Sequence, residues 1–502
     1  MVSRRCGDEI VMAEIRQESR GFLAKFTVLQ GAQRELWITL VAKFLNFAAY
    51  AVTNLTLKRW LSTEFGYSDQ QALGIVALWS LTMTVVTLLV GSLTDAIGLR
   101  KAFFLGVWVC LITRGVMVFA SVKWVALAFG LFPLAIGEAL GTPVLVAAIR
   151  RYSTTRQRSM SFSFSYMMMN VGSFAAAFLF DWVRQGLGEQ GHLSLPVAGT
   201  TLTTYRTLFL VSFVIQLLLL PLLWFVRRGA EATDDGVIFA PAPPRSAGTS
   251  LWNSFFSTLR NSARDTLRLF AGLLKQDGFY RLLAFLMLIA FLKLIFMQMY
   301  YVFPEFGIRV LGDGAPVGRL WAINSLIVIF LVPVVGALTQ RFPAYDMVTV
   351  GGVISAASVF IMALPPPWFQ GLADGAFGNW IGHHYLGLTG AVHPYYVMIT
   401  AYVIVLSVGE AFYSPRVYEY ASAIAPKGQE ASYAALSYIP FLLAKLLIGT
   451  FSGVLLATHC PAVGERHSET MWLFVALTAT IAPVGLMALR RFIRVPQAGR
   501  NH

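Results

Sequence analysis

Six ionisable side chains lie deep within long apolar stretches of the sequence. Four of them are two lysines and two glutamates, Lys43, Glu138, Lys293 and Glu410. If these stretches cross a bilayer, a charge near its centre is costly, so each residue is expected to face a partner or a cavity. A carboxylate in such a place can take up and release a proton, and a lysine can bind an anion. The four residues therefore predict a charged binding site, unless each lysine merely neutralises a glutamate and holds helices together.

Further polar residues in apolar stretches could join that site. Amide side chains offer a ligand both a donor and an acceptor, although they can equally bond between helices for about 1 kcal/mol each. Tyrosines can line a pocket or pack as aromatics, and a lysine can lie in a cavity wall or in an interface. The candidates of these kinds are Tyr50, Asn170, Tyr300, Asn324 and Lys445. Arg114 is expected to be structural instead, as a partner of Glu138 on the next apolar stretch.

The composition of the whole chain is that of a membrane protein. Of its 502 residues, 57% are hydrophobic and only 13% are charged, with a mean hydropathy of +0.65. Soluble domains carry about 25% charged residues, so this chain could not cover a soluble surface. Its many aromatic and aliphatic residues exclude a disordered chain. Three cysteines, Cys6, Cys110 and Cys460, provide neither a disulfide framework nor the spacing of metal ligands.

Twelve apolar stretches are long enough to cross a bilayer, which takes about 20 residues of helix. They do not alternate as the strands of a membrane barrel would, so we expect helices. The predicted spans are 35–57, 71–93, 101–121, 124–148, 160–180, 205–226, 281–303, 317–339, 346–364, 395–416, 432–456 and 470–490.

The basic residues predict the orientation of these spans. With the N-terminus inside, 27 of the 39 Lys and Arg residues fall on the cytoplasmic side, 8 fall outside and 4 lie within spans. This bias predicts that both termini are cytoplasmic, in the cell (inner) membrane. The net charge of +14 is thereby explained by topology, and nucleic acid is not expected as a partner. No apolar core precedes Leu36, so we expect no cleavable signal peptide.

The spans divide the chain into five parts. We expect a cytoplasmic segment at 1–34, a six-helix bundle at 35–226, a cytoplasmic linker at 227–280, a second six-helix bundle at 281–490 and a cytoplasmic tail at 491–502. Between 252 and 274 in the linker, apolar residues recur every three or four positions and basic residues lie off that stripe. This pattern predicts a helix on the membrane surface or a connector packed against the spans.

The two sets of six spans contain matching segments in the same order. AKFLNFAAYAV (42–52) matches LKLIFMQMYYV (292–302), GSLTD (91–95) matches GALTQ (336–340), and GEALGTP (137–143) matches GEAFYSP (409–415). Both halves have the same orientation because six spans return the chain to the cytoplasm. A parallel repeat of this kind predicts a two-bundle transporter with its site between the halves. It aligns Lys43 with Lys293 and Glu138 with Glu410.

The segment GSLTDAIGLRK (91–101) resembles the loop signature of the major facilitator superfamily. The matching residues are Gly91, Asp95, Gly98 and Arg100, whereas Ala96 and Leu99 replace basic residues. The resemblance implies an all-α membrane protein with twelve transmembrane helices in two six-helix bundles. It also implies a cytoplasmic gate in which Asp95 is the latch and Arg100 is among its partners. The alternative for these residues is a tight turn.

Within that superfamily, the chain resembles the proton-dependent oligopeptide transporters. The segments that carry the resemblance are FSYMMMNVGS (164–173), WAINSLIVIFLVPVVG (321–336) and SVGEAFYSPRVYEYASAIAP (407–426). The resemblance implies that Glu410 binds the amine of a peptide. Two departures concern substrate selection and proton coupling. The first span has Lys43 in place of the arginine of the Glu-x-x-Glu-Arg motif and lacks both glutamates, and Thr142 replaces a lysine in span four.

These features predict a secondary active transporter that moves a small polar or zwitterionic, peptide-like solute by alternating access, coupled to protons. A uniporter or exchanger of organic anions without proton coupling remains an alternative, as does a non-transporting receptor or scaffold. The expected partners are the solute, protons and the bilayer, and we expect a monomer. No cofactor, metal or enzymatic activity is expected. The chain has no phosphate-binding loop, and His383, His384 and His393 lack metal-site spacing.

Overall fold

The computed structural model describes residues 29–97, 99–154, 157–195, 199–227, 230–233, 236–239, 260, 264, 272, 275–339, 342–424, 439–447 and 451–494. Within these residues, 11 helices are long and apolar enough to cross a membrane. They coincide with eleven of the predicted spans. The remaining predicted span, 432–456, is described in two shorter helices, α20 (Ile439–Leu447) and α21 (Gly453–His459).

The helices of the first half follow the predicted spans and extend several of them. They are α3 (Arg34–Phe65), α4 (Asp69–Ile97), α5 (Leu99–Phe119), α6 (Lys123–Val125) continuing through the π-helix η2 (Ala126–Leu131) into α7 (Phe132–Arg151), α8 (Arg158–Leu187), and α9 (Thr204–Leu217) with α10 (Leu219–Trp224). Gly66 ends α3 in the left-handed conformation, at φ 66°, and its N–H bonds back to the last turn. Such a conformation favours glycine because glycine has no Cβ.

The second half repeats this pattern. Its helices are α12 (Asp277–Tyr301), α13 (Phe303–Leu311), α14 (Val317–Leu338), α15 (Ala344–Phe360), α18 (Pro394–Ile424), α20, α21, α22 (Ser468–Ala488) and α23 (Arg490–Ile493). Short helical turns fill the connection between α15 and α18, namely η3 (Ile361–Ala363), η4 (Pro366–Phe369), α16 (Gln370–Ala373), α17 (Ala376–Asn379) and η5 (Trp380–Leu386).

Two antiparallel hairpins lie outside the helices and were not expected from the sequence. One pairs β1 (His192–Leu195) with β2 (Thr200–Thr203), with Leu193 opposite Leu202. The other pairs β3 (Ala230–Thr233) with β4 (Gly236–Phe239), at the start of the predicted linker. Strands of four residues are too short to show a reliable alternating pattern, which explains why periodicity did not reveal them. The predicted amphipathic helix at 252–274 lies largely outside the described residues.

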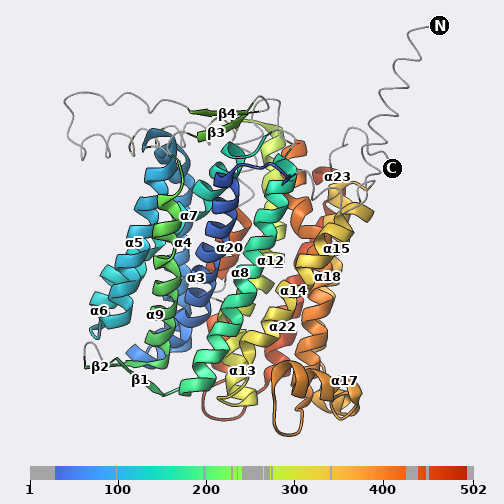
Figure 1. The fold of residues 1–502 in the computed structure, drawn as a ribbon. Helices are drawn as coiled ribbons and strands as arrows, with labels where there is room; N and C mark the ends of the chain where they lie inside the picture. Colours follow the sequence, from blue (N-terminus) through green and yellow to red (C-terminus); the bar gives the residue numbers. More distant parts are fainter. Residues whose placement is uncertain are drawn as a thin grey trace.

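Figure 1 shows that the start of α3, the hairpin β3–β4 and α23 lie at one end of the bundle, whereas β1–β2, α13 and α17 lie at the opposite end. The first end is the one that the basic residues predict to be cytoplasmic. We call it the cytoplasmic end and the opposite one the outer end.

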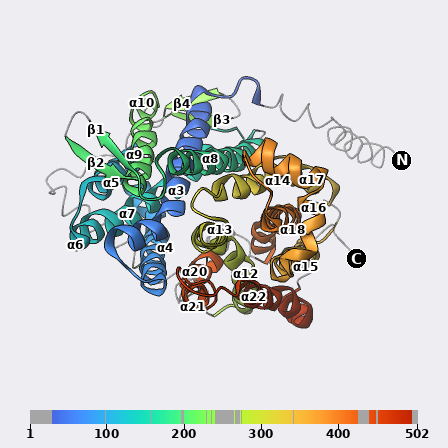
Figure 2. The same ribbon diagram turned by 90° about the horizontal axis from the view of Figure 1, so that it is seen from below.

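Seen from the outer end, the helices of the two halves form two groups beside each other (Figure 2). Helix α8 of the first half packs along α14 of the second, and α4 packs against α20 and α21. Residues on these helices are therefore placed to meet across the boundary between the halves.

Each half contains the same close crossing of two helices. A Cβ on Gly137 of α7 would lie 3.1 Å from the carbonyl oxygen of Gly106 on α5. A Cβ on Gly409 of α18 would lie 2.8 Å from the carbonyl oxygen of Gly351 on α15. Both crossings need glycine because the backbones approach too closely for a side chain. Gly137 and Gly409 directly precede Glu138 and Glu410, so the crossing sets the depth of both acids.

Candidate functional site

Glu410 lies where the two halves meet. Its Oε2 accepts a hydrogen bond of 3.0 Å from Asn324 on α14, and its Oε1 accepts one of 3.4 Å from the Tyr166 hydroxyl on α8. Asn324 also donates to the Ser407 hydroxyl at 3.0 Å. The side chain of Glu410 is buried, with 7% of the residue exposed. A buried carboxylate held by side chains of both halves can bind a cation or carry a proton.

Lys293 on α12 is the basic neighbour of this carboxylate. The two groups interact electrostatically, and Lys293 donates to the Ser414 hydroxyl at 3.4 Å. Its Nζ also lies 4.9 Å from the centre of the Tyr413 ring, a cation–π contact. In the second half, the predicted lysine and glutamate thus lie together.

The first half is different, because Glu138 is bonded to an arginine and not to Lys43. Arg114 on α5 is fully buried, and its guanidinium pairs with the Glu138 carboxylate on α7. The same guanidinium lies 3.4 Å from the Thr53 hydroxyl, which bonds to Ser212 at 3.0 Å. The predicted partnership of Arg114 and Glu138 is confirmed. The alternative in which Lys43 neutralises Glu138 is wrong, since the arginine already occupies the carboxylate.

The two equivalent acids therefore have unequal surroundings. Arg114 follows Gly106 of the close crossing by eight residues, and the residue at the same position after Gly351 is Val359. Val359 is fully buried and uncharged. The second half thus lacks the arginine that neutralises the acid of the first half. The carboxylate of Glu410 is left to Lys293 and to neutral hydrogen-bond donors.

Two more lysines lie deep in the bundle. Lys445 on α20 is 4% exposed and interacts electrostatically with Glu138 in the other half. Lys43 on α3 is 6% exposed, and its Nζ lies 5.9 Å from the centre of the Phe47 ring. Among the described residues, no ion pair is found for Lys43. Both lysines are predicted site residues, and Lys445 faces the boundary between the halves.

The predicted tyrosines and the first asparagine each contact a neighbour within their own half, and Tyr300 also interacts with Ser173 of the first half. Tyr50 packs beside Phe47 with ring centres 5.6 Å apart, and Tyr300 packs beside Trp321 at 6.1 Å. Asn170 donates to the carbonyl of Tyr166 on its own helix at 3.0 Å.

A hydrogen bond that the sequence reasoning missed lies near these tyrosines. The hydroxyl of Tyr301 donates to the Asn54 side chain at 2.5 Å and joins α12 to α3 across the boundary. The adjacent tyrosine pair at 300–301 was visible in the sequence, but only packing shows that Tyr301 makes this bond to Asn54 of the first half.

The predicted gate is only partly described. Gly91 and Asp95 belong to α4, but their side chains, and the whole of Gly98, lie outside the described residues. Arg100 on α5 donates to the carbonyl of Trp224 at 3.2 Å and lies over the Phe104 ring. The latch role of Asp95 stays a prediction.

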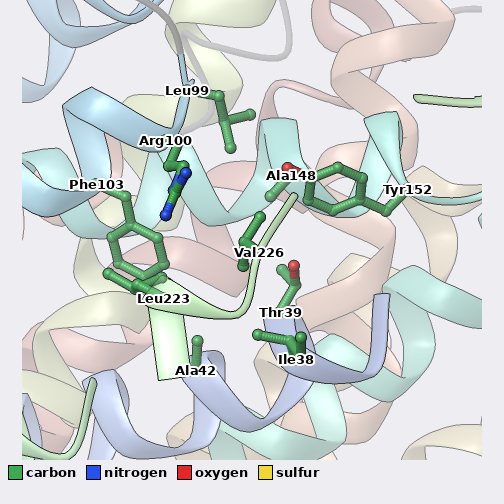
Figure 3. A pocket seen from close by; sticks show the side chains of 10 residues that line it. All are labelled: Ile38, Thr39, Ala42, Leu99, Arg100, Phe103, Ala148, Tyr152, Leu223 and Val226. Atoms are coloured by element: carbon green, nitrogen blue, oxygen red, sulfur yellow. The ribbon is translucent and has the colours of Figure 1, made fainter. Parts of the chain in front are cut away.

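A narrow pocket opens next to Arg100, at the cytoplasmic end (Figure 3). It lies within the first half and apart from Glu410, so it is distinct from the site between the halves. Its lining consists of Ile38, Thr39, Ala42, Leu99, Arg100, Phe103, Ala148, Tyr152, Leu223 and Val226.

At the outer end, a cluster of charged residues joins the halves. Lys58 on α3 lies 2.6 Å from Asp69 and 2.8 Å from Glu305 on α13. Arg309 on α13 lies 2.7 Å from Asp69 and 3.1 Å from Glu305. Burial alone would raise the pKa of Glu305, but Lys58, Arg59 and Arg309 hold that pKa below its usual 4.5. The carboxylate of Glu305 is thus ionised near neutral pH.

A second outer contact joins α8 to the start of α14. The Asp181 carboxylate on α8 accepts hydrogen bonds from the backbone N–H groups of Gly318, at 3.0 Å, and Arg319, at 2.6 Å. These are N–H groups of the first turn of α14, which no carbonyl of that helix can accept. Asp181 therefore caps a helix of the other half. Arg184 lies beside it at 3.3 Å and donates to the carbonyl of Asp313 at 3.0 Å.

The sequence reasoning did not select these outer residues, although it contained a signal. Lys58, Arg59, Arg184 and Arg309 are among the few basic residues on the outer side, and each has an acidic residue near it in the sequence or across the boundary. Acids and bases that gather at the ends of spans on the charge-poor side indicate pairing.

Comparisons with known proteins agree with this architecture. The chain is similar to a structure reported for substrate recognition in proton-dependent oligopeptide transporters, with a TM-score of 0.66 and 16% identity over 92% of this chain and 98% of that one. An autoinhibited peptide transporter of the POT family gives a TM-score of 0.65 and 15% identity over 94% and 99%. A bacterial homologue of the human drug peptide transporters gives 0.62 and 16% over 92% and 98%.

At 15–16% identity, these structures establish the fold. No curated protein matches the chain in sequence. The sequence pattern of the Major Facilitator Superfamily matches residues 39–382, which is more than half of the chain. Together with the eleven described spans and the two-bundle fold, this match shows that the chain is a multi-pass membrane protein and belongs to the major facilitator superfamily.

Proposed function

We propose that the protein is a secondary active transporter that moves a small peptide-like solute together with protons, by alternating access. The single observation that carries this proposal is the position of Glu410. It is a buried carboxylate at the boundary between the halves, bonded to Asn324 and to Tyr166 of the opposite half. A charge at this depth must be partnered, so binding of an amine or a proton there changes the balance between the halves.

The contrast with Glu138 supports the assignment of Glu410. Glu138 is neutralised by the buried Arg114, so it has little reason to exchange protons during a transport cycle. Glu410 has the weaker cationic neighbour, Lys293, whose point charge is shared among several contacts. A peptide amine would replace that lysine at Glu410, and the peptide carboxylate would bind Lys293 or Lys43.

Alternating access is supported by the outer contacts. The charged cluster around Glu305 and the cap formed by Asp181 both hold the outer ends of the halves together. Such contacts must break when the site opens outward and form again when it opens to the cytoplasm. Their strength lies in ion pairs and backbone hydrogen bonds, which can exchange for water without unfolding either half.

The test is uptake of labelled dipeptides by proteoliposomes with and without an inward proton gradient. We expect uptake to rise with the gradient for the unmodified protein. Glu410→Gln mimics the protonated acid, so it should abolish gradient-driven uptake and keep exchange of substrate across the membrane. Uptake that ignores the gradient in the unmodified protein would contradict proton coupling and favour a uniporter or exchanger.

Glu138→Gln is the matched control, because it makes the same change at the equivalent position of the other half. It should weaken transport, through loss of the bond to Arg114, without removing the response to the gradient. If the two variants behave in the opposite way, the coupling role belongs to Glu138.

A further inference from the structure

The charged groups deep in the bundle are unequal in number. Among the described residues near the middle of the spans, four buried cations face two buried carboxylates. Because each buried ion is costly without a partner of opposite charge, such an imbalance must be met by something other than these side chains. The groups are Lys43, Arg114, Lys293 and Lys445 against Glu138 and Glu410.

The two carboxylates are already engaged. Arg114 is paired with Glu138, and Lys293 interacts with Glu410, which also accepts bonds from Asn324. Lys445 interacts electrostatically with Glu138, but the arginine occupies that carboxylate. Among the described residues, Lys43 has no acidic partner at all.

The remaining two lysines lie toward the boundary between the halves. Lys445 interacts electrostatically with Glu138 across that boundary. Lys43 is on the same stripe of α3 as Tyr50 and Asn54, seven and eleven residues further along, and a helix brings such positions to one face. Asn54 on that face bonds to Tyr301 of the other half.

The contacts that Lys43 does make are too weak to replace a carboxylate. A cation–π contact such as the one with Phe47 stabilises a cation less than a carboxylate partner does in a buried ion pair. An anionic ligand between the halves would supply the missing charge.

We propose that the site selects small solutes that carry one more carboxylate than amine, so that they are negatively charged overall. The amine binds Glu410, and the two carboxylates bind the lysines that have no acid of their own, Lys43 and Lys445. This inference rests on the proposed transport function and names its substrate class.

The test compares three dipeptides of similar size as competitors of uptake in proteoliposomes. Glutamyl-alanine carries the extra carboxylate, glutaminyl-alanine replaces it with a neutral amide, and lysyl-alanine adds a cation. We expect glutamyl-alanine to inhibit at a concentration about tenfold lower than glutaminyl-alanine, the effect of one charge-assisted hydrogen bond. Lysyl-alanine should be the weakest. Equal inhibition by glutamyl-alanine and glutaminyl-alanine would overturn the inference and would fit lysines that bind in their neutral form.

Variants then tie the preference to the lysines. Lys43→Gln and Lys445→Gln should each remove most of the preference for glutamyl-alanine, measured as the ratio of the inhibitory concentrations of the two dipeptides in the same variant. Lys275→Gln, at an exposed position before α12, is the control and should leave the preference unchanged. If both site variants keep the tenfold preference, the lysines do not select the charge.

Glutarate, a dicarboxylate without an amine, separates this inference from the proposed function. If glutarate inhibits uptake only while Lys43 and Lys445 are present, and no dipeptide inhibits it, anion selection stands and peptide transport is contradicted. If dipeptides compete but charge does not matter, peptide transport stands and anion selection is contradicted. If neither competes, both are contradicted.

Discussion

Glu138 and Glu410 have the same sequence frame and the same crossing glycine, yet a single residue separates their chemistry. Arg114 lies within hydrogen-bonding reach of Glu138, and the equivalent position of the second half, counted from its crossing glycine, is the buried Val359. An arginine is permanently charged and binds a carboxylate through a fixed fork of donors, so it holds that carboxylate firmly in place. A neighbouring lysine is a point charge on a flexible stem and is more easily displaced. This difference gives Glu138 a structural role and leaves Glu410 available to bind an amine or a proton.

Removing Arg114 alone should therefore destabilise the first half. Arg114→Met leaves the Glu138 carboxylate buried and unpaired, which costs about 3–5 kcal/mol. We expect a clear fall in the thermal unfolding temperature of the purified protein in detergent. The double variant Arg114→Met with Glu138→Gln should regain much of the loss, since no lone charge remains. Additive losses in the double variant would mean that the two residues do not act as a pair.

At the scale of the elements, helix α8 contributes to both halves, because its Asp181 caps α14. Gly318 lies where the two helices approach most closely: a Cβ there would lie 2.2 Å from the carbonyl oxygen of Ala177. The contact requires that Gly318 on α14 has no side chain and that Asp181 on α8 provides a carboxylate. Either helix alone would form without the other, but the cap exists only while the outer ends are closed.

Gly318→Ala should consequently force the outer ends of α8 and α14 apart. Spin-label distances between these ends should gain a longer population in the variant, together with slower uptake. Gly336→Ala is the control on the same helix, because a Cβ there meets nothing within 4 Å. Unchanged distances in Gly318→Ala would show that α14 accommodates the methyl group without opening.

At the scale of the whole molecule, the outer cluster and the mid-membrane acids should respond to pH in different ranges. The pKa of Glu305 is lowered, so its ion pairs with Lys58 and Arg309 stabilise the closed outer end at pH values above 4.5. This stabilisation is lost as the pH falls through the lowered pKa. Between pH 5 and 8, closure by this cluster should not change.

Outer spin-label distances measured in the Glu410→Gln variant check this expectation. With Glu410 unable to titrate, the part of closure that depends on Glu305, measured as the difference from the same variant with Glu305→Gln added, should be constant from about pH 5 to pH 8 and should decrease only below about pH 4.5. A shift of that difference within the neutral range would contradict the lowered pKa of Glu305.

The positions of the spans and the pairing of Arg114 with Glu138 could be read from the sequence, because both depend on properties close along the chain. Hydropathy is a sum over each segment, and helices that follow one another in sequence pack side by side. The match of 137–143 with 409–415 likewise located the two buried acids.

Only the tertiary structure decided that Glu410 is bonded to the neutral side chains of Asn324 and Tyr166, and which residues join the halves. Tyr166 and Glu410 are 244 residues apart, and Asp181 and Arg319 are 138 apart. Such contacts depend on how two independently built bundles dock, which no local pattern encodes. The matching sequences of the two halves placed Glu138 and Glu410 at equivalent positions, whereas the packing of α5 and α15 makes their surroundings different.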